Sequence, residues 1–595
     1  MGRRRCLEGI SILVAALSAV ASRNAAAEPA PFRDTQPDTW VATDGLGRTV
    51  PGHEQVGPPR PGKFVGAFYF LWMGQHGTGG PYDITKILAA HPGAMTQPTH
   101  PAWGPPASFH FWGEPLFGYY LSDDRWVIRK HAQMLADAGV DVIIFDVTNQ
   151  EAYAKVYHAL CETFMRARQD GCRTPQIAFL CPFWNPTKVV ARLYEDLYGP
   201  GRYRELWFEW KGKPLIMADP DKVAPELRDF FTFRKPQPDY FQGPTGPDQW
   251  GWLEKYPQHV FRNAAGEAEQ MTVGVAQNTE GTRCCAFSEK NTLGRSWHNG
   301  AKDERPDAVN YGLNFAEQWE RALAVDPQFI FITGWNEWIA MRLPEFAGVR
   351  EPVMFVDQYT QEYSRDIEPM KGGHFDHYYY QMVSNIRRFK GVRPRPKASG
   401  LTRIEIDGTF DDWRNVKPEY RDDRDDTMHR DHPGYDGAGR YVNRTGRNDF
   451  ELLKVAADDR SVFFYAQTVQ PISPSNDRDW MLLLIDADCD AKTGWAGYDY
   501  LVNHQMKDAS TSIVQAWRGD RWKNVGEATY RVRGHGMELA IPRAILGFAD
   551  PAVRPRFDFK WADNLQSPLQ SAEDVATFML NGDVAPNSRF NYRFE

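Results

Sequence analysis

The residues best suited to chemistry form the segment Gly334-Trp-Asn-Glu-Trp338, which follows a short apolar run. Residues 329–332 have the β-branched and aromatic composition of a strand that is buried on both faces. Glu337 then lies just beyond the end of that strand, between Trp335 and Trp338. Flat indole surfaces suit the carbon face of a sugar ring and raise the pKa of a carboxyl group by excluding water. The segment predicts an acid–base site, unless Glu337 is a core acid that pairs with an arginine.

A second acid, Asp146, occupies the same kind of position after the apolar run 140–145, and Glu280 follows the run 271–276. Cleavage of a glycosidic bond needs a carboxylic acid that protonates the leaving oxygen and a carboxylate that acts as nucleophile or activates water. We predict Glu337 and Asp146 as the catalytic pair, with Glu280 as the replacement for either. The alternatives are that Asp146 orients an arginine or caps a helix, and that Glu280 is a structural loop residue.

Aromatic and polar side chains beside these acids are candidates for substrate binding, because indole and phenol rings stack on sugars. Long inserts follow the first strand, the Glu280 region and the Glu337 region, and loops of such length inside a compact domain are usually functional. A single histidine in such an insert is more often a hydrogen-bonding residue than a ligand. The candidates are Trp72, Trp184, Trp252, His298, Trp335, Asn336, Trp338 and Tyr359.

The elements that must position these residues alternate between strands and helices. The predicted strands cover residues 64–72, 140–145, 176–181, 214–218, 230–233, 249–253, 271–276 and 329–332. The predicted helices cover residues 123–138, 150–168, 187–197, 315–324 and 376–389. This alternation of strands and helices over about 335 residues predicts an α/β fold, namely a (β/α)8 TIM barrel with long insertions. The carboxyl ends of its strands would meet at one mouth of the barrel. A doubly wound open sheet is the alternative, although no G-x-G-x-x-G follows the first strand.

Four segments of this region resemble the barrel of glycoside hydrolase families 99 and 71, over roughly residues 60–390. They are Val65-Gly-Ala-Phe-Tyr-Phe70, Ala138-Gly-Val-Asp-Val-Ile-Ile-Phe-Asp-Val147, Trp210-Lys-Gly-Lys-Pro-Leu-Ile216 and Gly334-Trp-Asn-Glu-Trp338. The resemblance implies an endo-acting hydrolase of α-mannosides or α-glucans. In family 99 two catalytic glutamates lie three residues apart; the first matches Glu337, whereas the second falls on Ala340. The acids that we expect to replace the second are Asp146, Glu280, Glu345 and Asp357.

The start of the chain has the composition of an export signal. A basic lead, an apolar segment at 10–21 and a run of alanines predict a signal peptide over residues 1–27, followed by an extended arm at 28–60. The mature protein is then secreted or periplasmic, and no later run is long enough to span a membrane. Removing four arginines and one glutamate with the signal changes the formal net charge from −8 to −11. An acidic, aromatic-rich chain favours carbohydrate as partner over nucleic acid.

A second domain follows the predicted first domain, 61–392, and a Pro-rich linker, 393–401. Short alternating strands over 402–595 predict a β-sandwich. The linker predicts that the first domain stays folded when residues 400–595 are deleted. Four segments resemble a family 9 carbohydrate-binding module: Ile406-Asp-Gly-Thr-Phe-Asp-Asp-Trp413, Thr493-Gly-Trp-Ala-Gly-Tyr498, Glu538-Leu-Ala-Ile-Pro-Arg543 and Lys560-Trp-Ala-Asp-Asn564. The resemblance implies that exposed aromatic residues bind sugar. Trp495 and Trp561 are the candidates, with core packing as the alternative.

Three carboxylates alternate at Asp486, Asp488 and Asp490, a spacing that can gather hard oxygen ligands. We predict a structural calcium ion there, with a solvated turn as the alternative, and no cofactor for catalysis. The sequence as a whole predicts a secreted glycoside hydrolase that uses two carboxylates. The alternative is a non-catalytic glycan-binding protein on a barrel that has lost its second acid.

Overall fold

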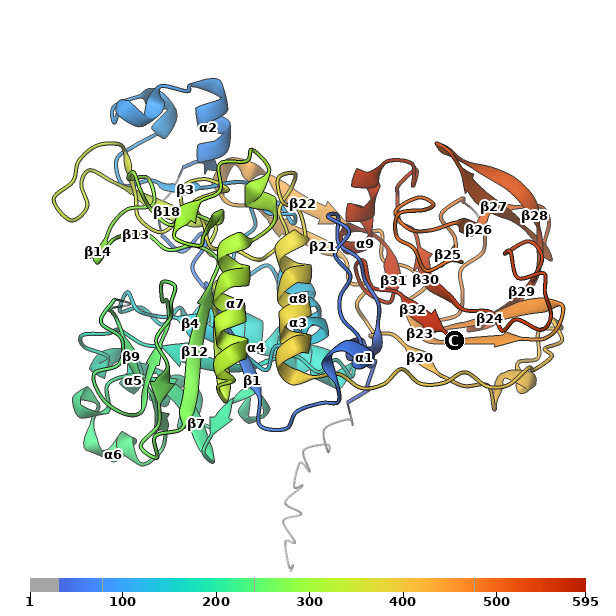
Figure 1. Cartoon of the computed structure of the whole chain (residues 1–595), viewed down its shortest axis with the longest axis horizontal. Coiled ribbons are helices and arrows are strands. Elements are labelled where there is room, and N and C mark those ends of the chain that lie inside the picture. The colour runs from blue at the N-terminus through green and yellow to red at the C-terminus, as the bar shows by residue number, and fades with distance from the viewer. Residues whose placement is uncertain (1–31, 77–78, 240, 476) are drawn as a thin grey trace, which may run out of the picture.

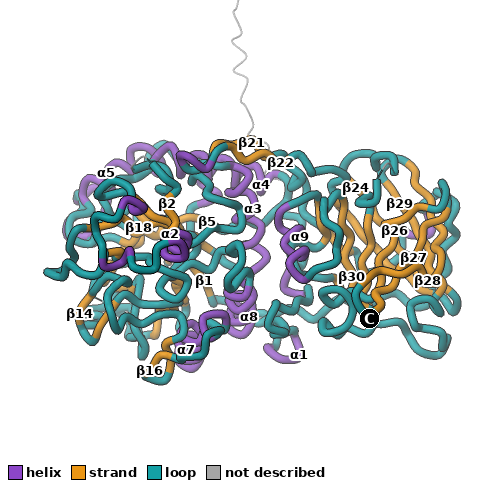
Figure 2. The backbone as a smooth tube through the Cα atoms, turned by 90° about the horizontal axis from the view of Figure 1, so that it is seen from above, coloured by secondary structure: helices purple, strands orange, loops and turns teal. Residues whose placement is uncertain are grey.

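The computed structural model describes residues 32–76, 79–239, 241–475 and 477–595 (Figure 1). The predicted signal peptide lies outside these residues. The long helices gather in one half of the molecule and the long antiparallel strands in the other, as Figure 2 shows. Among the described residues, no helix is both long and apolar enough to cross a membrane.

A sheet of parallel strands forms the centre of the first half. β17 (Phe329–Thr333) pairs with β1 on one side and with β12 on the other, and its residues are all buried. The strands follow the order β12-β17-β1-β4-β5-β7-β8. The others are β1 (Phe64–Tyr69), β4 (Val142–Asp146), β5 (Gln176–Leu180), β7 (Lys213–Met217), β8 (Thr232–Phe233) and β12 (Ala268–Gly274).

The gap between β8 and β12 is spanned by a separate parallel pair, β9 (Lys235–Gln237) and β10 (Gln249–Gly251). The side-chain amide of Gln270 in β12 bonds to both the N–H and the C=O of Gly251, each at 3.0 Å. A side chain thus makes the connection that a backbone ladder makes elsewhere in the sheet. The predicted barrel is confirmed to this extent: the sheet is a parallel half-barrel, extended by a pair that one glutamine bridges. Short antiparallel strands, β6 (Glu209–Trp210) and β11 (Phe261–Arg262), flank it.

Helices lie at the positions that the periodicity predicts. They are α3 (Arg125–Ala138), α4 (Ala154–Gln169), α5 (Thr187–Leu193), α7 (Leu313–Val325) and α8 (His377–Lys390). Asp124 caps α3 by accepting from the Trp126 N–H, and Gly139 ends the helix with a φ of 84°. Between β7 and β8 there are only two short turns, the 3-10 turn Pro220–Lys222 and the single turn α6 (Pro225–Arg228), and the described residues between β8 and β12 contain no helix. Five prolines between 236 and 257 explain this failure of the alternation, because proline interrupts helical hydrogen bonding.

The inserts after β1 and β17 meet in a small mixed sheet. Its order is β19-β18-β3-β2, from Met354–Phe355, Ile339–Leu343, Phe109–Phe111 and Tyr82–Asp83. α2 (Ile84–Ala90) follows β2 directly, and two hairpins come from the insert after β12: β13–β14 (Thr279–Glu280, Arg283–Cys284) and β15–β16 (Trp297–His298, Ala301–Lys302), of which β15 contacts α7. Long inserts therefore fold together at the end of the sheet where Glu337 lies.

The second half contains one antiparallel sheet of 11 strands, in the order β20-β23-β24-β29-β28-β27-β26-β25-β30-β31, with β32 paired to β30. Phe464 of β24 lies 5.7 Å from Phe557 of β30, so the sheet curls until distant strands share a core. The predicted strands are present, but they form one curled sheet rather than two separate ones. The strands are β20 (Tyr420–Arg421), β23 (Phe450–Ala457), β24 (Ser461–Thr468), β25 (Leu482–Asp486), β26 (Tyr500–Met506), β27 (Thr511–Arg518), β28 (Arg521–Arg533), β29 (Gly536–Pro542), β30 (Phe557–Asp563), β31 (Asp583–Ala585) and β32 (Tyr592–Phe594).

The two halves contact each other closely. Arg430, in the hairpin β21–β22 (Arg430–Pro433, Arg440–Asn443), donates to Asp124 at the start of α3 and to the carbonyl oxygen of Phe117. In the arm before β1, Trp40 packs on Phe590 with a centroid distance of 5.5 Å. Cavities of about 400 and 630 Å³ lie along this junction rather than beside Glu337.

Candidate active site

Glu337 lies four residues beyond β17 and is buried. Its side chain is only 11% exposed, and its Oε2 lies 3.5 Å from Nη2 of Arg365. Burial raises the pKa of Glu337 well above its ordinary value; Arg365 opposes the shift, whereas Asp357 and Asp146 add to it. Glu337 therefore holds a proton at a pH where an exposed glutamate has lost it, which is what a general acid requires.

Asp146 is the last residue of β4, and β4 and β17 both pair with β1, so the two acids lie at the same edge of the sheet. Its Oδ1 accepts from the N–H and hydroxyl of Thr148, at 3.0 and 2.7 Å. Its Oδ2 accepts from Nε1 of Trp72 at 3.4 Å. Burial raises the pKa of Asp146, although these hydrogen bonds oppose the shift. The carboxyl group is thus held in a fixed orientation.

Asp357 and Arg365 enter from the insert after β17. The guanidinium of Arg365 lies 3.4 Å from Oδ1 of Asp357 and 3.3 Å from Oδ1 of Asn278. The Arg365 side chain is 1% exposed, whereas that of Asp357 is 46% exposed. One buried guanidinium therefore joins a buried acid to a solvent-facing acid. We call Glu337, Asp146, Asp357 and Arg365 the acid cluster.

Aromatic rings lie beside the acid cluster. Trp72 is half-buried and stacks on Tyr153, with a centroid distance of 6.2 Å and an interplanar angle of 14°. The Tyr153 hydroxyl bonds to Nε2 of His76 at 2.7 Å. Trp252, also half-buried, packs between Phe68 and Phe183. Trp72 and Trp252 keep the partial exposure that a sugar-binding ring needs.

Trp184 lies in the loop after β5 and is 73% exposed. Its carbonyl oxygen accepts from Nζ of Lys222 at 2.7 Å, which fixes the backbone while the indole faces solvent. Trp184 therefore stays a candidate for substrate binding.

Three predicted binding residues have structural roles instead. Trp338 is fully buried, stacks on Trp112 with centroids 4.7 Å apart, and donates to Glu368 at 2.6 Å. Trp335 is also fully buried, with its ring 5.5 Å from that of His131. The Asn336 amide accepts from the Phe70 N–H at 2.8 Å and donates to its C=O at 3.2 Å. The prediction that these residues touch sugar is wrong, because none presents a face to solvent.

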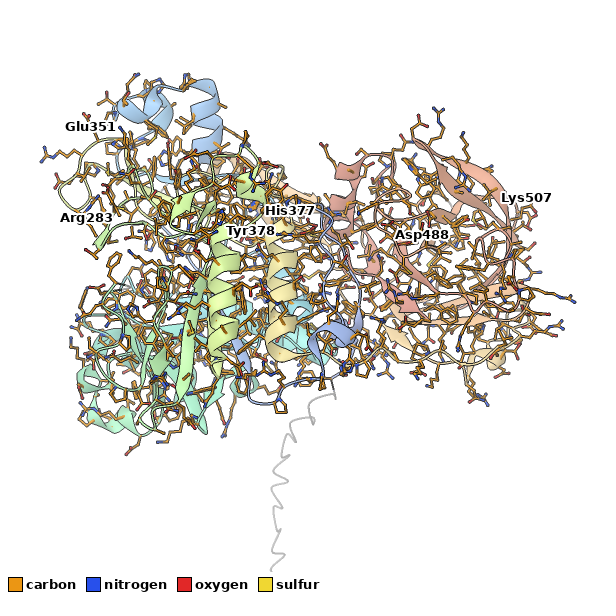
Figure 3. All side chains as sticks on the ribbon, in the orientation of Figure 1. Arg283, Glu351, His377, Tyr378, Asp488 and Lys507 are labelled. Atoms are coloured by element: carbon orange, nitrogen blue, oxygen red, sulfur yellow. The ribbon has the colours of Figure 1, made fainter. Side chains whose placement is uncertain are left out.

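Glu280 lies on the exposed hairpin β13–β14, and Figure 3 places its partner Arg283 at the outer side of the first half. It accepts from Asn291 at 3.0 Å and from Arg283 at 3.1 Å, and these bonds lower its pKa. A stabilised, exposed carboxylate is a poor proton donor. Among the interactions of the described residues, Glu280 is joined to this hairpin rather than to Glu337, so its predicted catalytic role is not supported.

His298 and Tyr359 have different surroundings. His298, in β15, lies 3.8 Å from Asp303 and bonds to Asn299, which is a local structural role. Tyr359 is half-buried and stacks on Phe355 and Tyr363. Because it lies two residues from Asp357, Tyr359 remains a candidate for substrate binding.

Ala340 occupies the position where the resembled family has its second acid. It is buried in β18 and packs in one cluster with Ile84, Trp103, Val353 and Phe355. A carboxylate there would lie against that apolar cluster, with the fully buried His110 opposite it in β3. Of the replacement acids, Glu345 pairs with the exposed Arg350, so Asp146 and Asp357 are the acids that lie near Glu337.

The predicted sugar-binding tryptophans of the second half are core residues. Trp561 is fully buried against Phe450, and Trp495 is 2% exposed and donates to the Ser571 carbonyl oxygen at 2.9 Å. Their predicted role is therefore wrong, and the core-packing alternative holds. Trp517 and Trp522, whose rings lie 5.2 Å apart, are partly exposed and better placed for binding.

The aspartate oxygens that lie together at the predicted calcium segment come from a different set of residues. Oxygens of Asp486, Asp488 and Asp499 lie within 4.8 Å of one another, in the strand-rich half where Figure 3 labels Asp488. Asp490 instead accepts from the Lys492 N–H at 3.0 Å. Burial, with repulsion from neighbouring aspartates, raises the pKa of Asp486 to about 8, and its Oδ1 has no hydrogen-bond partner in the described structure. This oxygen-rich set fits a hard cation.

Sequence reasoning missed the contributions of Arg365 and Tyr153 to the site. Arg365 lies in an insert whose length alone signals function, but its partners become visible only when that insert folds back on β17. Tyr153 adopts a left-handed backbone with a φ of 54°. A bulky residue there is uncommon and often marks a functional site, but the backbone angle cannot be derived from sequence.

Comparison with known proteins gave distant similarities. No family model and no curated protein matches the chain. Two solved structures of the GH99 endo-alpha-mannosidase from Bacteroides thetaiotaomicron share 14% and 17% identity with it, each with a TM-score of 0.32. They cover 55% and 56% of this chain and 97% and 98% of their own. A glycoside hydrolase-like protein shares 11% identity over 56% of this chain and 95% of its own, with a TM-score of 0.29. At these TM-scores the similarities assign no family.

Proposed function

We propose that this protein is a glycoside hydrolase in which Glu337 is the general acid. The observation that carries the proposal is the acid cluster: Glu337 is buried, its pKa is raised, and Asp146 and Asp357 lie near enough to repel its charge. Cleavage of a glycoside needs one carboxyl group that holds a proton and one that is ionised. Burial raises the pKa of Glu337 well above its ordinary value, whereas the hydrogen bonds from Thr148 and Trp72 favour the charged form of Asp146 against its own burial.

Each member of the acid cluster then has a role. Glu337 donates its proton to the leaving glycosidic oxygen. Asp146, oriented by Thr148 and Trp72, is the carboxylate that attacks the sugar or activates water. Arg365 positions Glu337 and Asp357, and Asp357 is the second choice for the carboxylate role.

The substrate class follows from the surroundings of the acids. Trp72, Tyr153, Trp252 and Trp184 offer ring faces to sugar units, as carbohydrate recognition requires. The likeness of the Gly334–Trp338 segment to families 99 and 71 favours an endo-acting enzyme on an α-linked glycan. In this proposal the protein is exported, and the C-terminal region is a carbohydrate-binding module with calcium at Asp486, Asp488 and Asp499.

A panel of α-mannans, α-glucans and β-linked polysaccharides tests the proposal, scored by released reducing ends. We expect release on at least one α-linked polymer, with loss in the Glu337→Gln and Asp146→Asn variants. No release from any polymer by folded protein would contradict a hydrolase.

A non-catalytic glycan-binding protein is the second candidate. Two observations favour this candidate. Ala340, at the position of the resembled family's second acid, packs in an apolar cluster, and Glu337 pairs with Arg365 as a structural acid would. Binding of a polymer in an affinity gel, with no hydrolysis and no effect of Glu337→Gln, is the result that it predicts.

A further inference from the structure

A buried group of aspartates lies where the C-terminal sheet meets α3, far from the predicted calcium segment in sequence. One oxygen from each of Asp426, Asp449 and Asp583 lies within 4.8 Å of the others. All three residues are buried. They come from the loop after β20, the residue before β23 and the first residue of β31. Three separate segments therefore converge on one point.

Several oxygens at this point lack partners in the described structure. Oδ1 of Asp426 and Oδ1 of Asp449 make no hydrogen bond, and neither oxygen of the fully buried Asp422 makes one. Burial raises the pKa of Asp422 well above its ordinary value, and repulsion from Asp583, Asp426 and Asp449 adds to the shift. Buried polar oxygens without partners are costly, so their convergence indicates a missing positive ligand.

The nearby basic side chains do not supply that ligand. Arg129 donates to Asp170 at 2.9 Å and to the Arg424 carbonyl oxygen at 2.6 Å. Lys560 donates to the carbonyl oxygen of Pro586. A third basic side chain, Lys130 of α3, also lies near Asp583, and its Nζ lies 5.6 Å from the centroid of the Trp126 ring. Three basic side chains thus face a larger set of buried acids: Asp137, Asp422, Asp423, Asp426, Asp449 and Asp583.

We propose that Asp426, Asp449 and Asp583 bind a calcium ion, with Asp422 as a further carboxylate ligand. Calcium takes six to eight oxygen ligands at about 2.3–2.6 Å, so ligand oxygens up to about 5 Å apart can share one ion. Magnesium usually keeps several waters, which a buried all-carboxylate site does not favour. Carboxylate oxygens also disfavour softer transition metals.

The ion would strengthen the junction between the two halves. Nε2 of Gln133, in α3, donates to Oδ2 of Asp426 at 2.8 Å and to Oδ2 of Asp423 at 3.1 Å. By fixing Asp426, a bound ion also fixes the acceptor of this interdomain hydrogen bond. Calcium bound only by the folded protein then stabilises the whole chain by mass action.

The test uses the full mature chain, treated with chelator and then titrated with CaCl2. We expect calorimetric binding and a rise of several degrees in Tm. Asp449→Asn and Asp583→Asn should each remove one equivalent of bound calcium by elemental analysis. Asp488→Asn, in the other aspartate group, is the matched control and should leave this equivalent in place.

If the Asp449 and Asp583 variants fail to fold, the Asp488→Asn protein decides the matter, because the other aspartate group is impaired in it. A Tm that calcium does not change, with no calcium bound after dialysis, would overturn the proposal. The proposal would also be overturned if Asp488→Asn abolished all calcium binding while Asp449→Asn left calcium binding intact.

Discussion

The protonation of Glu337 depends on two opposing effects on one carboxyl group. Burial favours the neutral acid, whereas Arg365 at 3.5 Å favours the charged form. Because burial exceeds the attraction, the pKa is raised. Glu337 is therefore a buried acid that an arginine positions, rather than one half of a tight ion pair.

This balance predicts how stability depends on pH. Between the ordinary glutamate pKa, about 4.3, and the raised value, folded protein keeps a proton that unfolded protein releases. The free energy of unfolding of the wild type should therefore fall with rising pH, relative to Glu337→Gln, which cannot titrate. Urea unfolding of both proteins from pH 4 upward measures the difference. A Gln variant that becomes relatively less stable as pH rises would show that the ion pair dominates.

Ala340 gives a second prediction for a single residue. Ala340→Glu should lower the free energy of unfolding by at least about 1–3 kcal/mol, because it places a carboxylate against Trp103 and Phe355. Met341→Glu is the matched control, because Met341 is the next residue of β18 and is exposed. Chemical denaturation measures both. An Ala340→Glu protein that keeps its stability and gains activity would contradict the packing argument.

At the scale of elements, the sequence predicts the strands and helices of the first half well because their apolar periodicity is strong. β17 and α3 are examples: a continuous β-branched run, and a periodic apolar segment that ends at Gly139. The region between β8 and β12 was harder to predict, because five prolines leave a weak pattern. For 402–595 the strands could be predicted, but alternation does not tell whether strands form two sheets or one.

The candidate site could be predicted only in part, for a related reason. Strand ends identify Glu337 and Asp146, because parallel strands bring their carboxyl ends together. The sequence does not tell whether a tryptophan is exposed to a sugar or buried in the core. The prediction of sugar binding is therefore wrong for four buried tryptophans: Trp335, Trp338, Trp495 and Trp561. Which insert folds back on the site also depends on tertiary contacts such as Arg365 with Asp357.

The hairpin β13–β14 provides a test between two acids. Asp146→Asn should lower hydrolysis by on the order of 10² or more, because Asp146 is held beside Glu337 at a strand end. Glu280→Gln, on the exposed hairpin, should leave hydrolysis unchanged. Initial rates of reducing-end release compare the two. The opposite order of effects would return the catalytic role to Glu280.

At the scale of the whole molecule, the junction argues against a first domain that folds independently of 402–595. Arg430 reaches Asp124 across the junction, and Phe590 packs on both Trp40 and Tyr380. Removing the C-terminal region would expose these groups together. The Pro-rich segment 393–401 thus joins two halves that share one continuous core.

Two arginines of one hairpin measure the strength of this junction. Arg430→Gln should lower the free energy of unfolding by roughly 3–5 kcal/mol, because it leaves Asp124 buried without its charge partner. Arg440→Gln, which removes an exposed pair with Asp431, should cost about 0–1 kcal/mol. Thermal or urea unfolding of the full chain gives both values. Equal costs would mean that the junction adds little to stability.

The most direct test of the central claim is hydrolysis by Glu337→Gln on the polymer that the wild type cleaves, measured together with its unfolding. Glutamine keeps the shape of the side chain but cannot exchange a proton. We predict that hydrolysis falls by on the order of 10² or more while the free energy of unfolding at neutral pH does not fall. A fully active but destabilised Glu337→Gln protein would contradict the claim, and would make Glu337 the structural partner of Arg365.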